Sequence, residues 1–280
     1  MRETEIVKRI RQMAAAGIHA SSIIRGIGDD CAILRPRANE DLVFTTDFVI
    51  EGRHFTHDTH AAADVGHTAL ARSLSDLAAM GAEPVFCLVS LAIPAKLSDR
   101  WIKDFYRGLL ALASKYKITL AGGDLSRFEK VITDVMCCGR LPRGKAMLRS
   151  AAKPDDGIYV TGELGRTKRP EPRVAEGMAL RRSGVKAAID ISDGLVIDLH
   201  RFCLESGVSA ELDNVPVSRG ASLEDALYKG EDYELLFASP RSYYRAIRIG
   251  TIRKGKPGEI KMSGKRIQVK GFDHFNESSR

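Results

Sequence analysis

The sequence predicts an α/β (α+β) protein with two domains. Apolar strand patterns alternate with amphipathic helix patterns along most of the chain, which is typical of this class. The length of 280 residues is enough to bury two modest cores. A turn signal, Pro-Asp-Asp-Gly at 154–157, separates two such series of elements. We therefore expect an N-terminal domain over residues 1–150 and a C-terminal domain over residues 151–280.

The first domain begins with an amphipathic pattern over 3–16 that predicts a helix ended by Gly17. The pattern over 61–80 predicts a strong helix, because Leu70, Leu74 and Leu77 share one face. Pro94 is expected to end the apolar strand before it. The remaining expected elements are strands at 31–34, 42–47, 85–93, 118–121 and 131–139 and a helix at 101–116.

The second domain repeats the alternation. A polar, proline-bearing stretch at 163–173 predicts a loop after the first strand. The expected elements are strands at 158–162, 185–191 and 208–213 and helices at 174–182 and 194–206.

Composition excludes several classes of protein. Apolar residues make up 44% of the chain, and the apolar run 85–95 is too short to span a bilayer, so we expect no membrane partner. Five cysteines without metal or disulfide spacing predict a reduced, cytoplasmic protein. The net charge of +7 is concentrated at 241–270, which we interpret as a solvated surface and not as a nucleic-acid-binding tail. A positive field would also suit an enzyme that handles polyphosphates.

The most informative pattern is the position of aspartates. Three of the expected strands run from apolar to small residues and then deliver a carboxylate at the C-terminal end, namely Asp47, Asp124 and Asp190 with Asp193. Asp30 closes Gly-Ile-Gly-Asp-Asp, and Asp76 lies in a helix. Carboxylates gathered at one sheet edge repel each other unless cations bridge them, and hard oxygen ligands suit magnesium. The pattern predicts a magnesium site that binds phosphate groups.

Each of these residues also has a structural alternative. Asp30 could serve a turn, Asp76 could pair with Arg72 on its helix, and Asp193 could cap the helix at 194–206. A single histidine such as His54 is more often structural than catalytic. We find no nucleophile–base constellation, so no covalent catalysis is expected.

Residues 139–146 resemble a P-loop. The stretch Gly-Arg-Leu-Pro-Arg-Gly-Lys-Ala fits G-x-x-x-x-G-K, but Ala146 replaces the hydroxyl ligand of magnesium. Pro142 also removes an N–H from the would-be phosphate cradle. We predict that Lys145 is a surface lysine.

Motifs along nearly the whole chain resemble those of the thiamine-monophosphate kinase family. They are GIGDDCA (26–32), TTDFVIEGRHF (45–55), LSDLAAMGAEP (74–84), LAGGD (120–124), LRSAAKPDD (148–156), AIDISDGL (188–195), GEDYELLF (230–237) and KGFDHF (270–275). The resemblance implies the aminoimidazole-ribonucleotide-synthetase-like fold, with an N-terminal domain that binds ATP and magnesium and forms a homodimer. It also implies direct transfer of the γ-phosphoryl group of ATP to thiamine monophosphate.

The resemblance assigns roles to individual residues. Several magnesium ions would be held by Asp30, Thr45, Thr46, Asp47, Asp76, Asp124, Asp190 and Asp193. ATP would be contacted by Tyr106, Gly123, Asp124, Arg149 and Ser192, and thiamine monophosphate by His54, Glu231 and Phe272. Catalysis would then consist of positioning and charge neutralisation.

The chain departs from the family pattern at two points. Only Glu-Leu-Gly-Arg-Thr-Lys-Arg-Pro-Glu-Pro separates Gly162 from Arg173, where the family has a longer connection, and Lys229 stands where glycine is usual. Three alternatives therefore stay open: another ATP-dependent enzyme of the superfamily, a nucleotide-binding homologue that lost activity with the shortened segment, or a basic RNA-binding protein.

Overall fold

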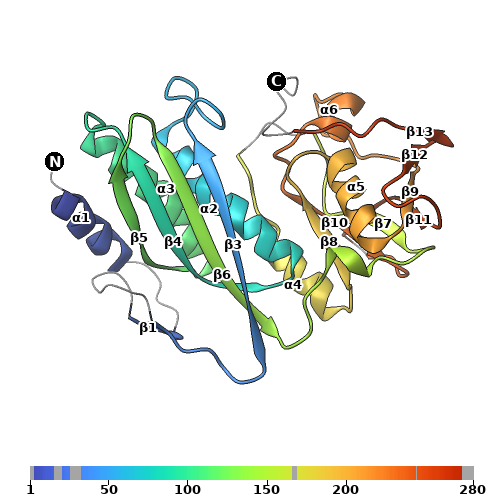
Figure 1. Ribbon diagram of the computed structural model, residues 1–280, viewed down its shortest axis with the longest axis horizontal. Coiled ribbons are helices and arrows are strands. Elements are labelled where there is room, and N and C mark those ends of the chain that lie inside the picture. The colour runs from blue at the N-terminus through green and yellow to red at the C-terminus, as the bar shows by residue number, and fades with distance from the viewer. Residues whose placement is uncertain (1–2, 16–20, 26–32, 166–168, 244, 273–280) are drawn as a thin grey trace. The chain divides into compact units, whose positions relative to one another are not determined.

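A computed structural model describes residues 3–15, 21–25, 33–165, 169–243 and 245–272 (Figure 1). The chain forms two compact units, each built from helices and strands, so the predicted α/β class is confirmed. Unit 1 comprises Met1–Leu77 and Glu83–Arg143, and unit 2 comprises Ala78–Ala82 and Gly144–Arg280. The division thus falls after residue 143, whereas the sequence pattern suggested residue 150. The segment Ala78–Ala82, which includes the last two residues of the helix Ala62–Ala79, also belongs to unit 2.

Unit 1 is a four-stranded sheet with helices packed on one face. Its strand order is β3-β6-β4-β5, with β4 and β5 parallel and the other pairs antiparallel. A separate antiparallel pair, β1 and β2, precedes it in the chain. The elements are α1 (Glu3–Ala15), β1 (Ile23–Arg25), β2 (Ile33–Leu34), β3 (Glu40–Ile50), α2 (Ala62–Ala79), β4 (Glu83–Ile93), α3 (Asp99–Tyr116), β5 (Thr119–Arg127) and β6 (Ile132–Pro142).

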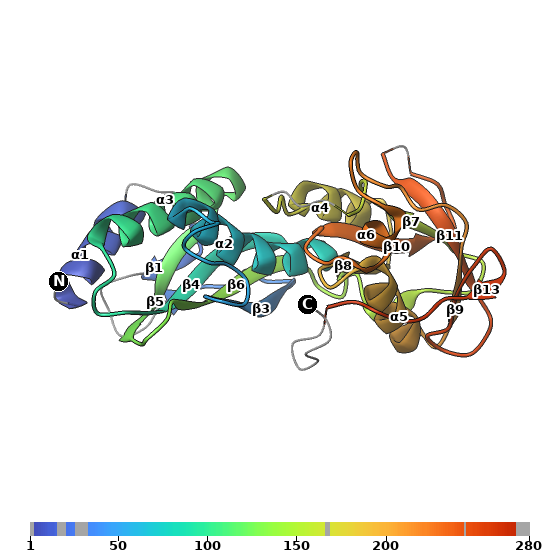
Figure 2. The same ribbon diagram turned by 90° about the horizontal axis from the view of Figure 1, so that it is seen from above.

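Helices α2 and α3 cover one face of this sheet, and the opposite face is turned toward the viewer in Figure 1 (Figures 1 and 2). Leu70, Leu74 and Leu77 of α2 are buried, as their shared face predicts. The opposite sheet face, called the open face below, carries Phe44 and Phe48, which are 60% and 55% exposed. No helix among the described residues is long and apolar enough to cross a membrane.

Two strands extend further than the sequence suggests. β3 continues three residues past Asp47, and β5 continues three residues past Asp124. The prediction that these carboxylates end their strands was therefore wrong. Both strands continue because they stay paired with neighbours along their whole length, β3 with β6 and β5 with β4.

Unit 2 contains a seven-stranded mixed sheet in the order β13-β12-β9-β11-β7-β10-β8. Helix α5 packs on it through Leu195, Leu199 and Phe202, and α4 lies on the other side of the sheet (Figure 2). The elements are the 3-10 turn η1 (Arg149–Ala151), β7 (Gly157–Val160), α4 (Val174–Arg182), β8 (Ala187–Ile191), α5 (Leu195–Ser206), β9 (Ser209–Leu212), α6 (Leu223–Tyr228), β10 (Glu234–Ser239), β11 (Ile247–Arg253), β12 (Ile260–Met262) and β13 (Lys265–Arg266).

The contact between α2 and α3 depends on a glycine. A Cβ atom on Gly108 of α3 would lie 1.8 Å from the backbone oxygen of Ala63 in α2. The two helices therefore approach so closely that no side chain fits at this position, and any substitution must move backbone.

We expect Gly108→Ala to lower the free energy of unfolding by about 1–3 kcal/mol through overpacking. This loss should appear although alanine favours helix over glycine by about 1 kcal/mol. Urea denaturation measures the change. Ala111→Gly, at an exposed position of the same helix, is the control and should cost only the propensity difference. A Gly108→Ala protein more stable than the parent would contradict the close crossing.

Candidate active site

A polar group lies on the helix-covered face of the unit 1 sheet, where β3 meets α2. The Thr45 hydroxyl donates a hydrogen bond to the Asp76 carboxylate. Arg72, one turn before Asp76, has its Nε atom 3.9 Å from the Asp47 carboxylate. The structure thus brings together three predicted magnesium ligands, Thr45, Asp47 and Asp76.

The electrostatics of this group disfavour two bare carboxylates. The pKa of the Asp47 carboxyl is raised to about 7, first by burial and then by the neighbouring Asp76, while Arg72 acts in the opposite direction. A bound cation would remove the mutual repulsion. The donors are carboxylate and hydroxyl oxygens, which are the ligands that magnesium prefers.

Thr46 points the other way. Its hydroxyl donates to Asp134 on β6, on the open face of the sheet. Consecutive residues of a strand point to opposite faces, so the side chains of Thr45 and Thr46 cannot reach the same ion within one sheet. The structure does not bring the Thr46 side chain to Asp47 and Asp76.

Asp124 is also remote from that group. It lies on β5, the edge strand opposite β3, and it is aligned with Ser90 of β4, which is aligned with Asp134 of β6. Directly paired residues share a face, so Asp124 lies on the open face. Three strand spacings, about 14 Å, separate β5 from β3. The expectation that all the predicted carboxylates meet at one sheet edge was therefore wrong within a single protomer, since Asp47 and Asp124 lie apart.

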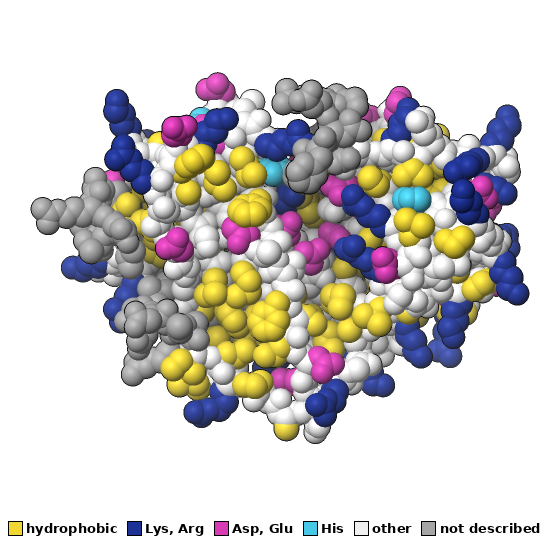
Figure 3. Space-filling view, in the orientation of Figure 1, with side chains coloured by type: hydrophobic (Ala, Val, Ile, Leu, Met, Phe, Trp, Pro, Cys, Tyr) yellow, Lys and Arg dark blue, Asp and Glu magenta, His cyan; other side chains and the backbone are white. Residues whose placement is uncertain are grey.

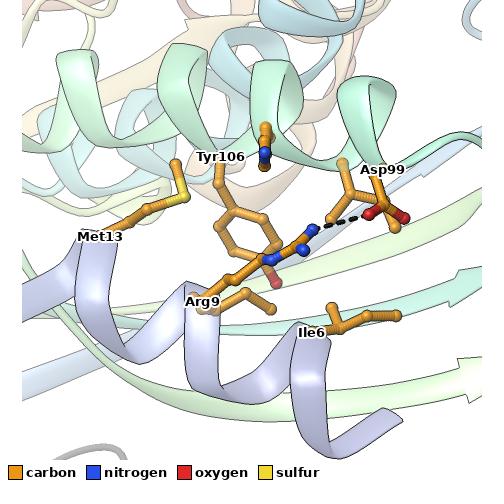
Figure 4. A pocket seen from close by; sticks show the side chains of 8 residues that line it. Ile6, Arg9, Met13, Asp99 and Tyr106 are labelled. Carbon is orange, nitrogen blue, oxygen red and sulfur yellow. Dashed lines mark hydrogen bonds and ion pairs between the residues drawn. The ribbon is translucent and has the colours of Figure 1, made fainter. Parts of the chain in front are cut away.

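The predicted ATP contact Tyr106 is buried between α1 and α3. Its ring lies under Ile6, Arg9 and Met13 of α1, and Arg9 pairs with Asp99 at 2.7 Å (Figure 4). Burial raises the pKa of its hydroxyl. The space beside the ring is too small for a nucleotide base.

A larger cavity of about 380 Å³ lies nearby in unit 1, with Ile6 and Ile102 common to both linings. Its other walls include Ile93, Leu97 and Leu125. Leu125 directly follows the predicted ATP contacts Gly123 and Asp124 in the sequence. Its lining also includes the polar residues Ser126 and Arg127, and it lies beside the strand that carries two predicted ATP contacts.

His54 lies in the turn after β3. Its Nδ1 atom accepts a hydrogen bond from the backbone N–H of Ile50 at 2.9 Å, and the backbone N–H of His54 donates to the backbone oxygen of Ile50. These bonds fix the position of the imidazole ring. Asp30 lies outside the described residues.

In unit 2 three predicted site residues lie close together in the sequence, Asp190 in β8 and Ser192 and Asp193 in the loop between β8 and α5. One buried carboxylate, that of Asp198, accepts hydrogen bonds from the backbone N–H groups of residues 192, 193 and 194 at 2.9–3.2 Å. Arg201 connects Asp198 to the Asp193 carboxylate, at 2.9 and 2.6 Å. The pKa of Asp198 is raised to about 6, mainly by burial and against the lowering effect of the Asp193 N–H.

The alternative role of Asp193, as the N-cap of α5, does not hold. The N-cap residue is Gly194, which has a φ of 123° and makes no side-chain capping bond. Asp198, inside the first turn, takes over this role because its side chain reaches back to the loop N–H groups.

The same loop also receives two of the predicted thiamine contacts. The backbone N–H of Glu231 donates to the Ser192 oxygen at 2.8 Å, and that of Phe272 donates to the Asp193 oxygen at 2.9 Å. Gly230 allows this approach, since a Cβ atom there would lie 2.5 Å from the Ser192 oxygen. Unit 2 therefore brings Ser192, Asp193, Glu231 and Phe272 together around one loop.

Arg149 lies in η1 and is held to the other end of α5. The Ser206 hydroxyl donates to the Arg149 backbone oxygen at 2.6 Å. The predicted ATP contacts Arg149 and Ser192 thus lie near opposite ends of the same helix.

The shortened segment 163–173 is anchored on both sides of residues 166–168. The Gly165 N–H donates to the Asp232 carboxylate at 3.0 Å, and buried Leu164 bridges to Val217. Arg173 forms a two-pronged bond with the buried carboxylate of Glu234, which also accepts from the Thr161 hydroxyl. The described residues at both ends of the segment are therefore held by other parts of unit 2.

Within the described ranges, no three acidic, histidine or cysteine side chains are grouped closely enough to hold a metal ion. The unit 1 group nevertheless fits magnesium by its donors, since Asp47 and Asp76 meet on one side of β3 with a threonine hydroxyl beside them.

Several side chains of these groups were not predicted as functional. Asp198 carries a signal, because it is a carboxylate on the otherwise apolar face formed by Leu195, Leu199 and Phe202. Asp134 and Glu234 lie in strands and depend on partners distant in sequence, which local patterns do not reveal.

Comparison with known proteins adds the family. Residues 28–141 match the family described as AIR synthase related protein, N-terminal domain. Thiamine-monophosphate kinase of Salmonella typhimurium is 35% identical over an alignment that covers 89% of this chain and 91% of that protein. The chain belongs to the thiamine-monophosphate kinase family.

Solved structures of this family agree. The crystal structure of thiamine-monophosphate kinase from Stenotrophomonas maltophilia has a TM-score of 0.83 and 34% identity, covering 95% of this chain and 98% of that one. The structure described as AaThiL complexed with AMPPCP and TMP has a TM-score of 0.79 and 28% identity, covering 98% and 99%. The predicted aminoimidazole-ribonucleotide-synthetase-like fold is thereby confirmed.

The P-loop-like stretch has the wrong structure for phosphate binding. Gly139–Pro142 belong to β6, and Lys145 is exposed in the turn that follows. A P-loop needs a loop between a strand and a helix N-terminus. Here the next element is the short turn η1.

We expect Lys145→Ala to leave ATP affinity and turnover within about threefold of the parent, as for an ordinary surface change. Calorimetric ATP titration and a turnover assay measure both quantities. Asp124→Asn, tested alongside, should be strongly impaired. An inactive Lys145→Ala variant together with an active Asp124→Asn variant would overturn the assignment of phosphate binding to the aspartates.

Proposed function

We propose that the protein is a thiamine-monophosphate kinase that transfers the γ-phosphoryl group of ATP directly to thiamine monophosphate, giving thiamine diphosphate and ADP. The observation that carries this proposal is the unit 2 loop, where Ser192 and Asp193 are hydrogen-bonded to Glu231 and Phe272. Residues expected to contact the nucleotide and its metal thus adjoin residues expected to contact thiamine monophosphate.

In this reaction the protein positions its substrates and needs no covalent intermediate. A phosphate oxygen of thiamine monophosphate would attack the γ-phosphorus, and ADP would leave. His54, Glu231 and Phe272 would orient the acceptor, while Gly123, Asp124, Arg149 and Ser192 would hold ATP. The cavity beside Leu125, which is lined by apolar side chains and by Ser126 and Arg127, offers space for the base.

Magnesium would be held by Asp30, Thr45, Asp47, Asp76, Asp124, Asp190 and Asp193, and by Thr46 through its backbone oxygen, since its hydroxyl faces away. When bound, it neutralises phosphate charge in the transition state. Support comes from the oxygen donors and from the repulsion between Asp47 and Asp76.

The proposal is tested by incubating the purified protein with ATP, magnesium and thiamine monophosphate, and measuring thiamine diphosphate and ADP. Formation of both supports it. Binding of ATP with magnesium but without formation of ADP would identify a nucleotide-binding homologue that lost activity. Phosphorylation of a different acceptor would identify another enzyme of the superfamily.

We also propose that the protein is a cytoplasmic homodimer that acts through residues 1–150 as its ATP-binding and dimerising domain and 151–280 as its C-terminal domain. The support for the dimer is the apolar open face of unit 1, where exposed Phe44 and Phe48 lie among half-buried Leu42, Leu88 and Met136 (Figure 3). Exposed apolar patches of this kind mark interfaces. Asp124 lies on this same face, so it would lie at the interface with a second copy.

We expect Asp47→Asn and Asp124→Asn each to lower turnover at least about a hundredfold, because phosphate charge is left without its cation. The turnover assay measures this, with unfolding midpoints as a check of the fold. Asp58→Asn, an exposed aspartate of unit 1, is the control and should retain activity.

The same two variants test whether sites are shared. Mixing them under conditions that exchange protomers should restore roughly a quarter of parental activity, since half the dimers are mixed and each has one intact site. No recovery despite exchange would mean that Asp47 and Asp124 act within one protomer.

We expect Phe272→Ala to raise the KM for thiamine monophosphate about tenfold and the KM for ATP little. The loss of an aromatic contact weakens binding by about 1 kcal/mol or more, whereas the backbone bond to Asp193 survives the change. Steady-state kinetics with each substrate varied give both constants. Phe128→Ala, at an exposed phenylalanine of unit 1, controls for loss of an aromatic ring. Equal effects on both substrates would make Phe272 a packing residue only.

A further inference from the structure

The backbone of the loop at 192–194 turns three consecutive N–H groups toward one point. Such an arrangement is a ready site for an anion, and in many proteins a phosphate group occupies it. Here the anion is internal. The Oδ2 atom of Asp198 accepts all three bonds, at 3.0, 2.9 and 3.2 Å, and the residue is only 1% exposed.

Because these N–H groups are taken, the loop has other groups left for ligands. They are the Ser192 hydroxyl and the carboxylate of Asp193. The backbone oxygens of Ser192 and Asp193 are also engaged, by the N–H groups of Glu231 and Phe272. The loop is therefore held from both sides by its backbone.

The second oxygen of Asp198 extends this control to Asp193. Oδ1 accepts from Arg201 at 2.9 Å, and the same guanidinium nitrogen donates to the Asp193 Oδ2 atom at 2.6 Å. Three of these residues lie on or next to α5, so the helix fixes their spacing. A chain of contacts runs from Asp198 through Arg201 to a proposed magnesium ligand.

We propose that Asp198 is a positioning residue for phosphoryl transfer: it fixes the 192–194 loop and, through Arg201, directs the Asp193 carboxylate toward the cation. Asp198 touches neither substrate nor metal. The proposal rests on the proposed function, since Asp193 matters only if the loop binds a metal–nucleotide complex.

The comparison of Asp198→Asn with Asp156→Asn tests it. Asp156 is also a buried aspartate of unit 2 and also accepts a loop N–H bond, from Lys153 at 2.9 Å, but it lies in the turn before β7. Both substitutions should lower the unfolding midpoint. Only Asp198→Asn should raise the magnesium concentration for half-maximal turnover, and lower kcat, by about 10- to 100-fold, the usual scale for partners of metal ligands.

Two measurements that need no turnover accompany this assay. Amide hydrogen exchange should show faster exchange at 192–194 in Asp198→Asn and parental rates there in Asp156→Asn. Calorimetric titration with ATP should show that, of the two variants, only Asp198→Asn needs a higher magnesium concentration to bind ATP. Magnesium dependence equal in the two variants would overturn the proposal.

If Asp198→Asn does not fold, Arg201→Gln decides the question. Arg201 is partly exposed, so the fold should tolerate its loss. The substitution should raise the magnesium concentration needed for half-maximal turnover, while Asp198 still protects the amides of residues 192–194 from exchange. An unchanged magnesium requirement in a folded Arg201→Gln protein would overturn the proposal. A parental protein that makes no thiamine diphosphate but keeps these differences in exchange and magnesium-dependent binding would instead contradict the proposed function.

Discussion

Along β3, Thr45 and Asp47 lie on the face covered by α2, whereas Thr46 lies on the open face with Asp134. This alternation is a property of every extended strand, and it sorts the polar residues of unit 1 into two groups. The register of four paired strands carries the sorting across to Asp124 at the far edge. Backbone pairing therefore limits which carboxylates can share an ion, whatever rotamers their side chains adopt.

Much of the fold could be predicted because its signals are local. The buried face of α2 and the stop at Pro94 after β4 follow from neighbouring residues alone. The ends of β3 and β5 could not be predicted in this way, since polar Asp47 and Asp124 resemble strand ends until their pairing partners are known. Strand order is likewise set by contacts between distant segments, so the separation of Asp47 from Asp124 was not visible in the sequence.

The candidate site shows the same limit. The motif residues Ser192, Asp193, Glu231 and Phe272 were predicted as separate segments, and the structure joins them through two backbone hydrogen bonds. Asp198 escaped notice because it follows the motif and lies in a helix. The shortened segment raised doubt about unit 2, yet Arg173 closes its end by an ion pair with the buried carboxylate of Glu234, which leaves that charge compensated.

The internal carboxylate at 192–194 has a consequence for the design of inhibitors. Compounds that mimic phosphate commonly gain affinity from backbone amides, but the amides of this loop already face a fixed negative charge. A bare anionic group would meet repulsion from Asp198 and Asp193 there. Compounds that present a hydroxyl acceptor to Ser192, or a cationic group to Asp193, suit the chemistry of this surface better.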